Sequence, residues 1–151
     1  MTAFVRAEDL GSDADPARKL WGLALLMAVR DRASSVHYHP WRGDGALAYV
    51  VANTRVEMSP PEPGWAERCV AAARSLLIQR RSLLGRILVG QPYPKCGSLV
   101  FGVAERRIEW EVVCWSSGKR FGVEFFRITP IEDETAAGSS VPTDNEASSG
   151  R

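Results

Sequence analysis

The two histidines of the chain, His37 and His39, stand two residues apart. Because successive side chains of a strand alternate between its faces, a strand here would place both imidazoles on one side. Imidazoles on one face can bind zinc or copper, and Cys96 or Cys114 could complete such a site. The spacing places no third ligand, so a structural pair is the favoured interpretation, and we expect no metal and no other cofactor. A metal-dependent enzyme that uses both histidines is the weaker alternative.

Signatures of nucleotide-binding and nucleophilic enzymes are missing from the sequence. Gly118-Lys119 is the only Gly-Lys pair, but Val113 stands where a phosphate loop has its first glycine and Arg120 where it has Ser or Thr. There is no GxSxG nucleophile elbow. Glu109 and Glu111 share one face of a predicted strand. We interpret them as part of a solvent-exposed sheet surface rather than as a catalytic acid/base pair. We therefore predict a protein that is not an enzyme.

A basic segment surrounds the end of the second predicted helix. It consists of Arg74, Arg80, Arg81 and Arg86. Forked guanidinium groups suit phosphates and acidic partners, so the segment is a candidate partner-binding site. A solvated helix face that complements the helix dipole is the favoured alternative.

Composition narrows the class of protein further. The 151 residues carry 19 basic and 18 acidic side chains, whereas proteins built to hold nucleic acid or a membrane surface usually have a marked positive excess. The three cysteines form no CxxC, so neither a zinc motif nor a disulfide framework is indicated. The longest apolar run, residues 23–29, is far shorter than the roughly 20 residues that span a bilayer, and acidic residues precede it. We expect a cytoplasmic protein without direct membrane insertion.

The hydrophobic pattern predicts an α+β domain. Apolar spacing of three and four residues predicts helices over 16–32 and 65–80. Alternation and turn residues predict six strands, over 36–39, 46–51, 54–58, 99–103, 107–115 and 121–128. We expect a mostly antiparallel sheet of about six strands with the two main helices packed on one face. Residues 1–14 are expected to be flexible, 15–130 to form the domain, and 131–151 to be a disordered acidic and polar tail.

Three short motifs follow one another in a recognisable order. Residues 33–40, Ala-Ser-Ser-Val-His-Tyr-His-Pro, match A-S-D-[IV]-H-[IL]-E-P with Ser35 and His39 in place of the acids. Residues 94–97 share Pro94 and Gly97 with the end of R-x-P-Q-D-G, with Cys96 in place of the aspartate, and residues 122–128 resemble G-E-x-x-V-[LM]-R. In this order the chain resembles the domain that precedes the motor in type II secretion and type IV pilus assembly ATPases.

The resemblance implies a function as well as a fold. It implies a stand-alone, non-catalytic relative of that domain, acting as an adaptor or regulator on a motor ATPase or another assembly component. The family's basic residues that reach a neighbouring subunit's nucleotide correspond to Ala48, Val50 and Pro92 here. The alternative function is a small-ligand sensor. Its pocket would be lined by aromatic residues of the late strands, Trp110, Trp115, Phe121 and Phe125.

Overall fold

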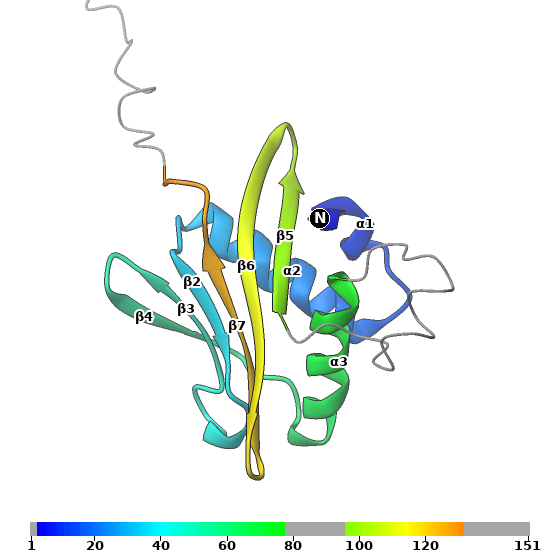
Figure 1. Cartoon of the computed structure of the whole chain (residues 1–151), viewed down its shortest axis with the longest axis vertical. Coiled ribbons are helices and arrows are strands. Elements are labelled where there is room, and N and C mark those ends of the chain that lie inside the picture. The colour runs from blue at the N-terminus through cyan, green and yellow to red at the C-terminus, as the bar shows by residue number, and fades with distance from the viewer. Residues whose placement is uncertain (1–2, 78–95, 132–151) are drawn as a thin grey trace, which may run out of the picture.

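The computed structural model describes residues 3–77 and 96–131. These residues form seven strands and three α-helices around one sheet (Figure 1). The helices are α1 (Ala7–Gly11), α2 (Pro16–Arg30) and α3 (Ala66–Leu76). The strands are β1 (Ala3–Arg6), β2 (Ser35–Tyr38), β3 (Leu47–Val51), β4 (Thr54–Met58), β5 (Cys96–Val103), β6 (Arg106–Ser117) and β7 (Arg120–Arg127).

The strand order in the sheet is β1-β5-β6-β7-β2-β3-β4. Every neighbouring pair is antiparallel except β1 and β5, which run parallel. The central pairing of β7 with β2 joins the late β5-β6-β7 meander to the early β2-β3-β4 meander. The predicted α+β class with a mostly antiparallel sheet is confirmed, although the sheet has seven strands and is mixed.

Helix α2 begins where the sequence supplies both a cap and a fixed backbone angle. Asp15 is the N-cap and accepts a hydrogen bond from the Ala17 N–H, while Pro16 occupies the first helical position. Trp21 lies at the centre of the buried side of α2. Its indole Nε1–H donates to the Cys69 carbonyl of α3 at 2.7 Å, and its ring packs 5.1 Å from that of Phe125. One side chain therefore ties together both long helices and the sheet.

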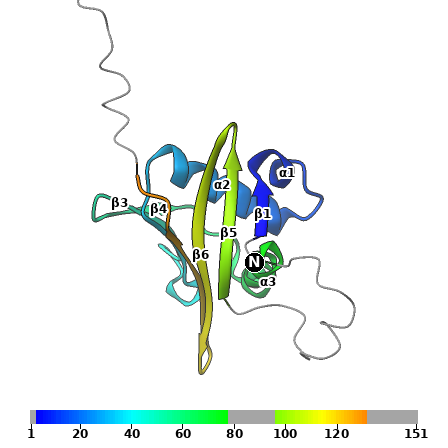
Figure 2. The same cartoon turned by 45° about the horizontal axis from the view of Figure 1, so that its top comes forward.

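Alternation divides the sheet into two chemically different faces. The helix face carries apolar side chains such as Val36, Trp110 and Phe125, which are fully buried beneath α2 and α3. The second face, here called the site face, carries the alternate residues, among them His37 and Glu124. None of the three α-helices lies on the site face, and Figures 1 and 2 show α1, α2 and α3 together on the other side of the strands. A short 3₁₀ helix, Pro40–Arg42, follows β2 and carries Trp41, which stacks on His39.

Two elements that the sequence did not predict lie within the stretch expected to be flexible, residues 1–14. β1 adds a parallel strand at the edge of the sheet, and α1 packs on α2. Leu10 is buried against Gly22, where an added Cβ would lie 2.7 Å from the Leu10 Cβ. A four-residue strand and a five-residue helix give too short a periodic signal to be recognised in isolation.

The other predicted elements differ from the structure mainly at their ends. Helix α2 stops two residues before the predicted end, and residue 32 has a positive φ of 61°. β4 has the predicted bounds, and the β3–β4 hairpin turns at Ala52 and Asn53, both with positive φ as a type I′ turn requires. The expected last turn of the second helix (78–80) and the tail after residue 131 lie outside the described residues. Within the described part, no helix is long and apolar enough to cross a membrane.

The link between Trp21, α3 and the sheet gives a first prediction. Replacing Trp21 by Phe removes the hydrogen bond to Cys69 and leaves a small cavity, so we expect a loss of about 1–3 kcal/mol in the free energy of unfolding. Urea unfolding followed by far-UV circular dichroism measures it. Leu23→Ala on the same helix is the control, since Leu23 is 57% exposed and should change stability by less than about 0.5 kcal/mol. Equal losses in the two variants would contradict the assigned role.

Candidate metal centre

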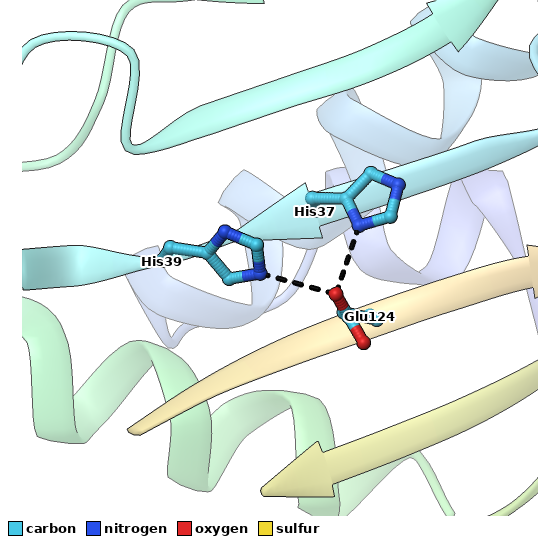
Figure 3. A group of neighbouring side chains, drawn as sticks. All are labelled: His37, His39 and Glu124. Carbon is cyan, nitrogen blue, oxygen red and sulfur yellow. Dashed lines mark hydrogen bonds and ion pairs between the residues drawn. The ribbon is translucent and has the colours of Figure 1, made fainter. Parts of the chain in front are cut away.

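His37, His39 and Glu124 form a cluster at the centre of the site face (Figure 3). His37 lies on β2, His39 follows the last residue of that strand, and Glu124 lies on β7. Figure 3 shows the carboxylate of Glu124 rising between the two imidazoles, with the helices behind the strands. One ligand atom from each residue lies within 4.8 Å of the other two.

Strand register brings these three residues together. In the antiparallel pairing of β2 with β7, His37 stands directly opposite Glu124. His39 continues the extended course of β2, with φ −122° and ψ 86°, and its N–H donates to the Ala46 carbonyl at 2.7 Å. The side chains of residues 37 and 39 therefore point to the same face, as the spacing predicted.

One carboxylate oxygen holds both imidazoles. Glu124 Oε1 lies 3.2 Å from His37 Nδ1 and 3.2 Å from His39 Nε2. In a tetrahedral zinc site, ligand atoms about 2.0–2.2 Å from the metal are roughly 3.3–3.5 Å from each other. Both nitrogen–oxygen separations are close to that spacing. The ligand atoms of all three residues lie within 4.8 Å of one another, so an ion would also require the two imidazoles to adjust until their nitrogens reach the same spacing.

The orientation of His37 is fixed from its far side. Its Nε2 lies 2.8 Å from the hydroxyl oxygen of Ser35, a buried residue two positions earlier on the same face. When Nδ1 is the ligand atom, Nε2 carries the proton and donates it to Ser35 Oγ. A second hydrogen bond of this type is what metal-bound histidines usually have, because it sets the tautomer and the ring orientation.

His39 is enclosed by aromatic rings. Its imidazole stacks on Trp41, with centroids 6.0 Å apart and planes within 14°, and meets Trp115 edge-on at 5.6 Å. The residue is 8% exposed, and its Nδ1 is buried without a hydrogen-bond partner among the described residues. Burial lowers the pKa of His39 below its ordinary value of 6.5, and the hydrogen bond to Glu124 only partly opposes this effect. The unprotonated form is the one that can bind a metal.

Gly122 makes room for this enclosure. An added Cβ there would lie 2.7 Å from the Tyr38 carbonyl oxygen, 2.9 Å from Trp115 Cζ2 and 3.0 Å from His39 Cδ2. The first of these atoms is backbone and cannot rotate away. Glycine at 122 is thus required for Trp115 and His39 to approach each other across β7.

The cysteines that could have completed a histidine site lie elsewhere. Cys114 is buried on the helix face, where burial raises the pKa of its thiol, although the Arg74 guanidinium opposes the change. Cys96 is an exposed residue of β5 and is not part of the cluster. The third donor, Glu124, was missed in the sequence. Its only signal is a carboxylate between apolar Val123 and Phe125, and the register that aligns it with His37 cannot be derived from that.

The candidate partner-binding arginines are only partly within the described residues. Arg74 is half-buried on α3 and reaches Cys114, so it is not a free basic group on a solvated face. Arg80, Arg81 and Arg86 lie outside the described residues.

The four aromatic residues expected around a ligand pocket do not share one. Trp110 and Phe125 are fully buried in the core, and Trp115 lies on the opposite face beside His39. Phe121 lines a cleft of about 430 Å³ whose wall also includes Trp41, Pro63 and Lys119. This volume is within the range of small-ligand sites.

Two comparisons with known proteins gave no match. No protein-family model matches the chain, and no curated protein is significantly similar to it. The assignment of the site therefore depends on its geometry alone.

The crowding at residue 122 gives a second prediction. Gly122→Ala should lower the free energy of unfolding by about 1–3 kcal/mol, because the methyl group meets backbone and two packed rings. Thermal and urea unfolding measure the change. Gly64→Ala is the matched control, since an added Cβ there meets nothing within 4 Å, and it should change stability by less than about 0.5 kcal/mol. A tolerated Gly122→Ala would show that the rings are not tightly packed.

The buried imidazole gives a third prediction, on pH dependence. Because the pKa of His39 is lower in the folded protein than in the unfolded chain, the unfolded chain binds this proton more readily. The corresponding stability is present above about pH 6.5 and is lost as the pH falls below that value toward the folded-state pKa. Urea unfolding at about pH 7.5 and about pH 5.5 should show a smaller acid-induced loss in His39→Gln than in the wild type. An unchanged loss in the variant would assign the pH dependence to other groups.

Proposed function

We propose that this protein binds one divalent transition-metal ion, with zinc as the best-suited ion, through His37, His39 and Glu124. The observation that carries the proposal is the convergence of three donor atoms, from β2, from the residue that follows it and from β7, to within 4.8 Å. The donors are His37 Nδ1, His39 Nε2 and a Glu124 carboxylate oxygen.

The donor chemistry selects the class of metal. Two imidazoles and one carboxylate suit zinc and neighbouring first-row ions, whereas calcium and magnesium prefer oxygen ligands and Cu(I) prefers sulfur. The burial of His39 favours the unprotonated imidazole, and Ser35 orients His37. These features prepare the nitrogen donors before an ion arrives, which reduces the cost of ordering them on binding.

Without an ion, the same residues form a hydrogen-bonded triad. His37 Nδ1–H and His39 Nε2–H can both donate a hydrogen bond to Glu124 Oε1. These two hydrogen bonds give the carboxylate oxygen its partners, but neutral imidazoles do not neutralise its negative charge. A divalent ion would replace these two hydrogen bonds with direct ligation and would compensate the negative charge of Glu124. That gain favours a functional site over a purely structural polar pair.

Three protein ligands leave one tetrahedral position for water or another donor. The side chains of His37, His39 and Glu124 are 16%, 11% and 26% exposed, so solvent reaches the cluster. Catalytic zinc sites keep such an open position, whereas structural sites are closed by four protein ligands. The open position favours a metal-dependent enzyme as the second candidate function.

Metal binding gives the fourth prediction. In a Cys96→Ser background, which removes an exposed thiol that could bind zinc by itself, isothermal titration calorimetry should detect about one Zn²⁺ per chain. Glu124→Gln should weaken binding at least about tenfold, because it removes the anionic donor. Binding should also weaken at acid pH, as protons compete with the metal for the imidazole of His39, whose pKa burial lowers below its ordinary value.

Glu111→Gln is the matched control for Glu124→Gln. Glu111 is an exposed carboxylate of β6 on the same face but outside the cluster, so its removal should leave the affinity unchanged. Less than about a tenth of an equivalent of bound zinc in the Cys96→Ser protein would end the proposal. Equal weakening by both glutamine variants would place the ion elsewhere.

The adaptor and sensor roles stay predictions. Docking on a secretion or pilus motor has no support from the two comparisons, and the basic segment that would serve it is mostly outside the described residues. The cleft beside Trp41 and Phe121 is the feature that favours a small-ligand role.

A further inference from the structure

β4 is the last described strand on its side of the sheet, and its outer edge faces no described element (Figures 1 and 2). The two-residue turn at 52 and 53 makes Val51 and Thr54 a hydrogen-bonded pair, so every second residue of β4 bonds to β3. Thr54, Val56 and Met58 are those residues. The backbone N–H and C=O groups of Arg55 and Glu57 therefore point outward, away from β3.

The outer edge of β4 carries one positive and one negative side chain, so it is complementary in charge to the β4 edge of a second molecule. Arg55 and Glu57 are exposed, stand two residues apart and share the site face. If two copies of β4 pair antiparallel about a twofold axis through Val56, Arg55 of each copy stands opposite Glu57 of the other. The outward backbone groups of these two residues are the ones that hydrogen-bond in this register. Four backbone hydrogen bonds and two cross-strand ion pairs would form together.

We propose that β4 joins two copies of this chain edge to edge into one continuous sheet. Other registers are disfavoured, because a shift by two residues puts Arg55 opposite Arg55 or Glu57 opposite Glu57, and like charges directly opposite are destabilising. Charges on edge strands commonly prevent pairing. An edge of one sign would do so here, but this edge carries both signs at the spacing that attracts a second copy.

The interaction is a weak one, because a five-residue strand offers a contact well below the usual size of a stable interface. Neither Arg55 nor Glu57 belongs to the metal cluster, so the proposal is independent of metal binding. Arg55 Nη2 donates to the Gly45 carbonyl at 2.6 Å, and the carboxylate of Glu57 also lies against Gly45, which precedes β3. Both side chains therefore lie on the β3 side of the strand and must turn outward to meet a second copy.

Charge reversal at the two exposed positions tests the dimer. Sedimentation velocity of the full chain from about 10 µM to about 1 mM should show a growing dimer fraction, the range in which a small interface dissociates. Glu57→Arg places Arg opposite Arg, and Arg55→Glu places Glu opposite Glu. Each single variant should raise the dissociation constant at least about tenfold. An equimolar mixture of the two variants should dimerise again, because their edges are complementary to each other.

Two results would overturn the proposal. One is a wild-type protein that stays monomeric throughout the concentration range. The other is a dimer that forms equally well in the single variants, which would place the contact elsewhere on the molecule. Circular dichroism of each variant confirms folding. Glu57→Gln removes the charge alone, whereas Glu57→Pro also removes an outward N–H without removing a β3–β4 hydrogen bond, so the proline variant should weaken the dimer more than the glutamine variant.

Discussion

The antiparallel pairing of β2 with β7 is the constraint on which both the core and the site depend. In one register it places Val36 opposite Phe125 on the helix face and His37 opposite Glu124 on the site face. A slip by one residue would reverse both faces, exposing the core side chains and burying the polar ones. The hydrophobic effect that holds Phe125 beneath Trp21 therefore also fixes the position of the carboxylate between the imidazoles.

Burial of a histidine beside two tryptophans is costly unless the surrounding structure supports it. The cost is reduced here because burial favours the uncharged form of His39 and its Nε2 is hydrogen-bonded to Glu124. The ring also packs against Trp41 and Trp115. Gly122 is the residue that permits this packing, since any side chain there would meet the Tyr38 backbone. The absence of a side chain at residue 122 thus determines how closely His39 and Trp115 can approach each other.

The sequence predicts the elements of this fold better than their arrangement. Alternation in residues 107–115 and the Asp-Pro start of α2 are local signals, and the structure has a long strand and a capped helix at these positions. Pairing between distant strands has no comparable local signal. Glu124 is 85 residues from His39 in the sequence, and its role follows only from the register of β7 against β2. The same reason explains why β1 was missed, since it is four residues long and pairs with a strand more than 90 positions away.

Because the two faces of the sheet are chemically separate, substitutions on them should affect stability differently. The apolar contacts that stabilise the fold lie on the helix face, whereas His37 and Glu124 lie on the site face and contribute little apolar burial. Substitutions of these two polar residues can therefore alter binding with a smaller effect on stability than substitutions in the core. His39 differs from both, because its ring is enclosed by aromatic side chains and belongs to the packing as much as to the site. Of the three proposed donors, His39 is therefore the one at which an effect on metal binding and an effect on stability would be hardest to separate. Glu124 is the more informative position for testing the proposed site.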